Sequence, residues 1–168
     1  GDMAPISALR YAPIVQVSVG LFNAQGIEHK AFGGLIPTCE QQQLLGILFP
    51  SACFSQRCPA QGALFSFFLG GLKHAEMSDK TDDELREIIM KALPMMLGFP
   101  HDVQPDRIQF FRHARAIPQY ELSSGDRFAA VARIEQAHPG LVIGGNLRDG
   151  IGMADRIRQG VAMGMQDD

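Results

Sequence analysis

The chain has 168 residues, a mass of 18.3 kDa and 46% hydrophobic residues, which fits one globular domain or one domain with an appendage. Its 15 basic and 18 acidic residues leave a net charge of −3, and no run of basic residues occurs, so we expect no nucleic-acid-binding surface. No apolar run approaches the ~20 residues of a membrane span.

The first half of the chain is predicted to form four strands. Valine at every second position within residues 11–22 predicts a strand with one apolar face. Further strands are expected at residues 31–36, 44–49 and 62–69, each ended by proline or glycine. Strands that follow one another without helices between them indicate an antiparallel meander.

A helix with a well-defined start follows at residues 81–97. Thr81 and Glu84 have the spacing of a capping box, in which each side chain satisfies a backbone amide of the first turn. Pro94 is expected to bend or shorten the last turn, and Gly98 is the expected C-cap.

The second half mixes strands and helices. We predict a strand at residues 107–120, a helix at 126–137, a short strand at 141–143 and a helix at 153–165. The predicted fold class is therefore α+β, with a mostly antiparallel sheet and about three helices.

The glycine-rich loop at residues 144–152 is the segment with the most chemical information. Glycines between a strand and a helix let the backbone approach a ligand, and the amides of the helix N-terminus attract anions or a flavin carbonyl. The alternative is an ordinary connection between a strand and a helix. We find no catalytic dyad and no histidine or cysteine spacing that indicates a metal site, so no catalytic residue and no metal ligand is predicted.

Five sequence blocks stand out in chain order. They are Phe32–Glu40 (FGGLIPTCE), Leu45–Phe54 (LGILFPSACF), Leu69–Gly71 (LGG), Ala116–Tyr120 (AIPQY) and Gly145–Ile157 (GNLRDGIGMADRI). Together they resemble the protoporphyrinogen oxidase family of the flavin-containing amine oxidoreductases, in the order found in the C-terminal part of that family. The residues that differ from the family's usual ones are Ser55, His113, Ser123, Ser124 and Arg156.

The resemblance implies a division into two parts. Residues 5–140 would correspond to most of a substrate domain, and residues 141–168 would be the C-terminal strand, glycine loop and helix that complete an FAD-binding domain. The family's dinucleotide fingerprint, G-x-G-x-x-G after a strand, has no match in this sequence. We therefore expect a C-terminal fragment whose FAD site is incomplete and which is inactive alone.

The resemblance also implies which residues bind the ligands. Phe32 and Leu35 are candidate contacts for a flat porphyrinogen-type substrate, with a place in the core as the alternative. Asp155 lies in the same sequence block, and the alternative to a role at the cofactor site is that it caps the last helix. The candidate cofactor-binding residues are Gly145, Asn146, Gly150, Ile151, Gly152, Met153 and Ala154.

The parent protein is expected to oxidise a porphyrinogen to a porphyrin, a step of haem biosynthesis, by hydride transfer to FAD. Two alternatives remain open: a related flavoenzyme with another substrate, such as an amine oxidase or a desaturase, and a non-catalytic interaction module that lacks the cofactor half. The expected partners are a porphyrinogen-type small molecule and the missing N-terminal half. We also expect the isolated chain to self-associate. The expected location is cytoplasmic, with peripheral membrane attachment of the parent as the alternative.

Overall fold

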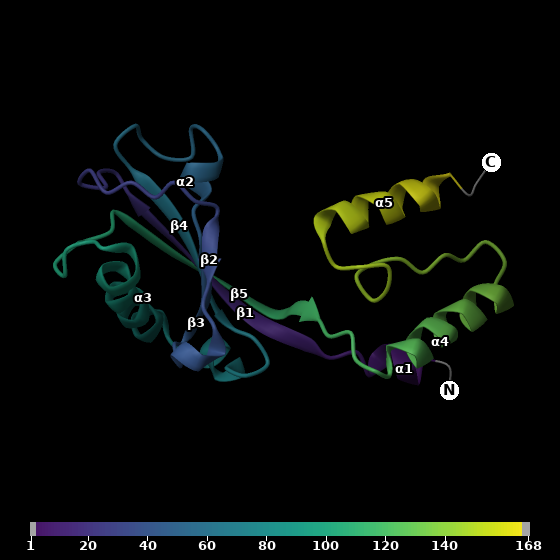
Figure 1. The fold of residues 1–168 in the computed structure, drawn as a ribbon. Helices are drawn as coiled ribbons and strands as arrows, with labels where there is room; N and C mark the ends of the chain where they lie inside the picture. Colours follow the sequence, from purple (N-terminus) through teal and green to yellow (C-terminus); the bar gives the residue numbers. More distant parts are fainter. Residues whose placement is uncertain (1–2, 166–168) are drawn as a thin grey trace. The chain divides into compact units, whose positions relative to one another are not determined.

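The computed structural model describes residues 3–165 (Figure 1). The longer helices lie close to the three that the sequence predicts, and four short helical segments were not predicted. In chain order the elements are α1 (Ala4–Ser7), β1 (Tyr11–Leu21), β2 (Gly33–Leu35), the 3-10 turn η1 (Thr38–Glu40), β3 (Leu44–Leu48), α2 (Pro50–Cys53), β4 (Ala63–Gly70), the 3-10 turn η2 (Ala75–Asp79), α3 (Asp82–Leu97), β5 (Arg107–Pro118), α4 (Ser124–Ala137) and α5 (Met153–Gly164).

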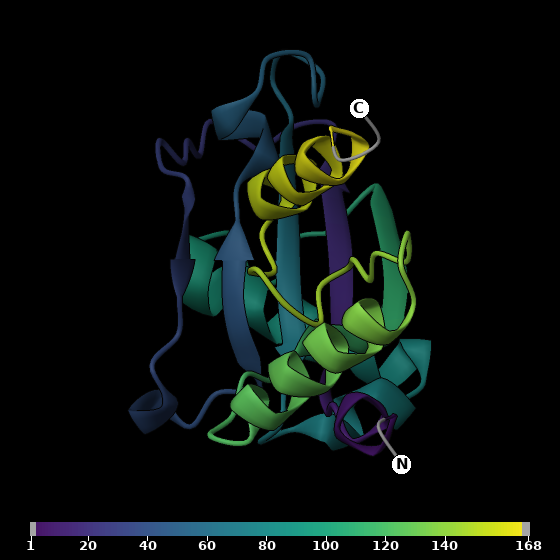
Figure 2. The same ribbon diagram turned by 90° about the vertical axis from the view of Figure 1, so that its right-hand side faces the viewer.

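The five strands form one sheet in the order β2-β3-β4-β1-β5 (Figure 2). The pairs β2–β3, β3–β4 and β4–β1 are antiparallel, which confirms the α+β class with a mostly antiparallel sheet. The expected meander holds only for β2, β3 and β4, because β1 pairs with β4 and not with β2. The strand β1 has eleven residues and a fully apolar face, which is buried best when strands pair on both of its sides. The strand β2 has only three residues and lies at the edge of the sheet.

The chain divides into two compact units. Unit 1 comprises residues 1–12 and 115–168, and unit 2 comprises residues 13–114. The boundaries fall inside β1 and β5. They do not test the predicted division after residue 140, which refers to the domains of a longer protein and stays a prediction.

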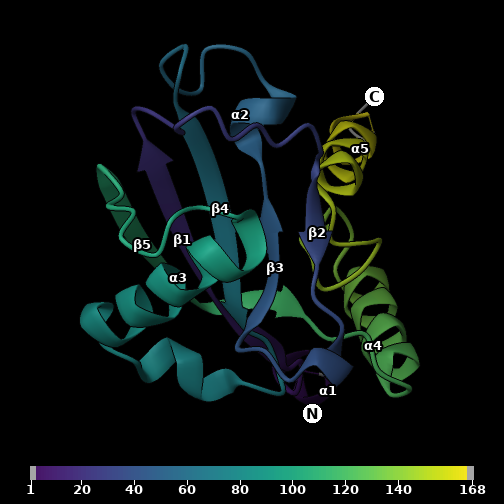
Figure 3. The ribbon, with the colours of Figure 1, turned by 60° about the vertical axis from the view of Figure 1, so that its left-hand side comes forward.

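Unit 2 buries the core between one face of the sheet and α3, which lies across the strands (Figure 3). The valines of β1 and alternate residues of β4, including Phe65 and Phe67, are almost completely buried against Leu85, Ile89 and Leu93 of α3. The predicted capping box is present: Glu84 N donates to Thr81 Oγ1 at 3.3 Å and Thr81 N donates to Glu84 Oε2 at 2.8 Å. Gly98 is the C-cap in the left-handed conformation, as predicted, while α3 continues past Pro94.

Unit 1 contains α1 packed against α4, and a long connection that leads from α4 to α5. The predicted strand at residues 141–143 is wrong, because this segment has no regular secondary structure. Ile143 N donates to the Glu135 side chain at 2.8 Å instead of to another strand, so the apolar run has no sheet edge to join.

Candidate functional site

The loop from residue 144 to 152 has a backbone that only small residues adopt easily. Gly145 and Gly150 have φ angles of 109° and 96°, and Asp149 has 62°. A Cβ at Gly150 would lie 2.4 Å from Asp155 Oδ2, which is closer than nonbonded atoms approach. Both the conformation and the close approach therefore require glycine at position 150.

Side-chain donors bind five carbonyls of this loop, those of residues 145–148 and of Gly150. Arg156 donates to Gly145 O and, at 2.9 Å, to Arg148 O. Arg127 Nε donates to Leu147 O at 2.8 Å. The Tyr120 hydroxyl lies 3.1 Å from Asn146 O and 3.4 Å from Gly150 O.

The direction of these carbonyls fixes the direction of the loop amides. In a trans peptide the N–H points opposite to the preceding C=O, and the described residues 3–165 contain no cis peptide bond. The N–H groups of Asn146, Leu147, Asp149 and Ile151 therefore point away from the donors. Within residues 3–165 these four amides have no hydrogen-bond acceptor. Backbone amides that lie close together in a loop without an acceptor suit an anion or a carbonyl-rich ligand.

Glu135 of α4 supports the start of the loop. Its carboxylate accepts from Ile143 N at 2.8 Å and from two nitrogens of Arg148 at 2.8 and 3.1 Å. The hydrogen bond from Ile143 N, and then that from Arg148, lowers the pKa of Glu135 below its ordinary value. The carboxylate is therefore held in its charged form at neutral pH.

The first turn of α5 follows the loop directly. Gly152 N donates to Asp155 Oδ2 at 3.2 Å, so the alternative role of Asp155 as a helix cap is confirmed. Ile151, Met153 and Ala154 are exposed, with Met153 80% accessible. The amides of a first helical turn have no acceptor within their own helix, so those of Met153 and Ala154 can bind a ligand.

The chain's own residues fit a flavin. The loop offers outward amides, exposed apolar side chains at Ile151 and Met153, and an open backbone at Gly145, where a Cβ would meet nothing within 4 Å. All seven predicted cofactor-binding residues lie in this loop or in the first turn of α5. Whether they bind a cofactor stays a prediction.

The two predicted substrate contacts lie in unit 2. Leu35 is in β2 and is 90% exposed, and Phe32 just before β2 is 71% exposed. Their alternative place in the core is therefore wrong. Because Leu35 pairs with Gly46, and a Cβ at Gly46 would lie 3.2 Å from Leu35 Cδ2, Leu35 lies on the sheet face opposite to α3.

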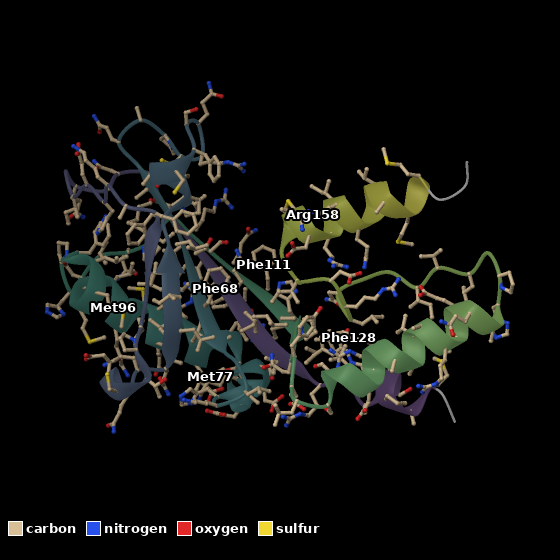
Figure 4. All side chains as sticks on the ribbon, turned by 45° about the vertical axis from the view of Figure 1, so that its right-hand side comes forward. Phe68, Met77, Met96, Phe111, Phe128 and Arg158 are labelled. Atoms are coloured by element: carbon tan, nitrogen blue, oxygen red, sulfur yellow. The ribbon has the colours of Figure 1, made fainter. Side chains whose placement is uncertain are left out.

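This open face also carries residues that the sequence analysis did not identify. The register aligns Gln16, Phe68, Gly46 and Leu35 in one row across β1, β4, β3 and β2. Figure 4 labels Phe68 on β4. The signal was present in β1, where Gln16, Ser18 and Gly20 alternate with the buried valines, but the partners of Gln16 depend on the strand order.

The sequence is similar to individual known proteins, although no family model matches the chain. Protoporphyrinogen oxidase 2 of Arabidopsis thaliana is 29% identical over 157 residues, and the mitochondrial protoporphyrinogen oxidase of Nicotiana tabacum is 29% identical over 160 residues. The chain is therefore similar in sequence to protoporphyrinogen oxidases. The resemblance to the C-terminal part of this family is thereby confirmed.

The protoporphyrinogen oxidase-like chain covers only part of these relatives. The matches include 90% and 92% of this chain but 30% and 31% of the two plant proteins. A solved structure assigned to protoporphyrinogen oxidase from Exiguobacterium sp. 255-15 has a TM-score of 0.78 and 15% identity, over 96% of this chain and 35% of that one. Reduced UDP-galactopyranose mutase has a TM-score of 0.62 and 10% identity, over 80% of this chain and 28% of that one. These two structures support the fold.

Proposed function

We propose that this chain forms the C-terminal part of an FAD-dependent oxidoreductase that converts a porphyrinogen to a porphyrin in haem biosynthesis. The observation that carries the proposal is the loop at residues 144–152. Its outward amides belong to the sequence block that resembles the family's cofactor-binding segment. The plant relatives, named as protoporphyrinogen oxidases, support the choice of substrate.

The proposed cofactor contacts follow from the loop geometry. When bound, FAD would accept the hydride that leaves the substrate. The amides of the loop and of the first α5 turn would donate to its polar groups, and the exposed backbone at Gly152, Met153 and Ala154 would lie against it. The chain matches 30% and 31% of the length of the two plant relatives, which supports a cofactor site that the rest of a longer protein completes.

Two of the proposed substrate contacts, Leu35 and Phe68, lie in one row on the sheet face opposite to α3, and the third, Phe32, is exposed just before β2. A flat, apolar tetrapyrrole would stack on Leu35 and Phe68 and would also contact Phe32. Hydride transfer to a flavin mainly requires that the substrate is positioned, so this part needs no acid–base pair. That requirement agrees with a chain in which no catalytic dyad was predicted.

A chimera tests the proposal. In it, this chain replaces the 157-residue segment of Arabidopsis protoporphyrinogen oxidase 2 that it matches. We expect the purified chimera to retain FAD and to oxidise protoporphyrinogen, as followed by porphyrin fluorescence. The same plant protein without the segment is the control, and it should lose both properties.

Two other results would each reject part of the proposal. A folded chimera that retains FAD but does not oxidise protoporphyrinogen would favour a related flavoenzyme with another substrate. A folded chimera without FAD would favour a non-catalytic interaction module. A cytoplasmic location stays a prediction; within residues 3–165, the structure has no helix of the length and apolarity needed to cross a membrane.

A further inference from the structure

The loop at residues 144–152 does not hold its own conformation. Its three positive φ angles are strained or entropically unfavourable, and no regular element includes residues 141–152. The bonds to its carbonyls come instead from side chains on other segments of unit 1. Of these donors, Tyr120 reaches both halves of the loop, because its hydroxyl lies near Asn146 O and Gly150 O.

Tyr120 is itself held by its neighbours. Its ring meets that of Phe128 edge to face with centroids 6.1 Å apart, and the Arg127 guanidinium lies 5.3 Å from its centre. Arg127 is only 3% exposed and also donates to Ser124 Oγ at 3.2 Å. A ring fixed by one aromatic and one buried cation presents its hydroxyl in a defined direction.

We propose that Tyr120 is a positioning residue, which shares its one hydroxyl proton between Asn146 O and Gly150 O, so that the amides that follow these carbonyls point away from the Tyr120 hydroxyl. It acts through the backbone and not by contact with the reacting atoms. The proposal rests on the proposed function in one respect only, namely that the ligand bound by these amides is FAD. It also gives a physical reason for the AIPQY block, since Tyr120 is the residue that couples this block to the glycine loop.

Tyr120→Phe is the test, because it removes the hydroxyl and keeps the ring between Phe128 and Arg127. Tyr11→Phe is the matched control. The Tyr11 hydroxyl donates to the same residue, but to the Asn146 side chain at 3.2 Å and not to a peptide group. These are the only two tyrosines, and the chain has no tryptophan, so each variant retains one tyrosine as the sole emitter of protein fluorescence.

The first readout needs no cofactor. We expect backbone NMR order parameters of residues 146–151 near ~0.85 in the unchanged chain and below ~0.6 in Tyr120→Phe. The parameters of α4 should stay unchanged. In Tyr11→Phe the loop should remain ordered, and Tyr120 emission should report the intact contact.

The second readout is FAD titration of the same three proteins. Loss of one hydrogen bond is expected to weaken FAD binding by about three- to tenfold in Tyr120→Phe. An ordered loop in Tyr120→Phe would overturn the inference, as would equal loosening in both variants. If the unchanged chain binds no measurable FAD, the order parameters alone decide the role of Tyr120, so this result is distinct from failure of the proposed function.

Discussion

At the scale of single residues, Gly150 is the loop position with the least room for a side chain. Gly150→Ala would place a methyl group against the Asp155 carboxylate at a φ of 96°. We expect this change to lower the free energy of unfolding by about 2 kcal/mol, as measured by urea denaturation. Gly160→Ala in α5 is the control: a Cβ there meets nothing within 4 Å, so a gain of about 0.5–1 kcal/mol is expected. Equal effects would contradict the strain at Gly150.

The carboxylate of Glu135 gives a pH-dependent prediction. Its pKa is lowered in the folded chain, first by the hydrogen bond from Ile143 N and then by Arg148. The stabilisation is therefore complete above the ordinary value of 4.5 and is lost as the pH falls through the lowered folded value. We expect the Ile143 amide resonance to shift in that acidic range. In Glu135→Gln the acid-dependent shift should disappear, and its persistence would show that another group causes it.

The sequence predicted the glycine loop but not what holds it. The glycines are adjacent in the chain, so their spacing is visible directly. One donor, Arg156, is 8 to 11 residues from the carbonyls that it binds. The other donors, Arg127, Tyr120 and Tyr11, are 20 to 135 residues away in sequence, and no periodicity relates them to the loop. A buried arginine at position 127 also runs against the expectation that a helix buries its apolar residues.

At the scale of elements, the start of α3 depends on the capping box of Thr81 and Glu84, which can be read from the sequence alone. Thr81→Ala removes the oxygen that accepts from Glu84 N. We expect the free energy of unfolding to fall by about 1 kcal/mol, as measured by chemical denaturation. Thr81→Ser retains the oxygen and should stay near the unchanged chain. A loss of equal size in Thr81→Ser would assign the effect to the methyl group instead.

Strands were predicted less completely than α3, because a strand needs a partner. The positions of β1, β3, β4 and β5 agree with the apolar patterns, whereas the pairing of β1 with β4 joins segments that lie far apart in the chain. Residues 141–143 have the apolar composition of a strand but no neighbouring edge. Composition therefore indicates where a strand can form, and tertiary contacts decide whether it does.

At the scale of the whole molecule, large apolar side chains remain exposed in both units. Phe32 and Leu35 in unit 2 and Met153 and Ile157 in unit 1 are more than half exposed. We expect the isolated chain to self-associate at high concentration, as measured by sedimentation velocity. Replacing both Phe32 and Leu35 by serine should shift the distribution toward the monomer. A monomeric unchanged chain at high concentration would contradict this prediction.

The division into units also bears on the order in which the chain can fold during synthesis. Unit 2 is one continuous segment, so all of its residues are synthesised before α4 and α5. Unit 1 joins the first twelve residues to the last fifty-four, and its Tyr11–Asn146 hydrogen bond spans 135 positions. The contacts that hold the glycine loop therefore need both ends of unit 1, and we expect them to form later than the contacts within unit 2.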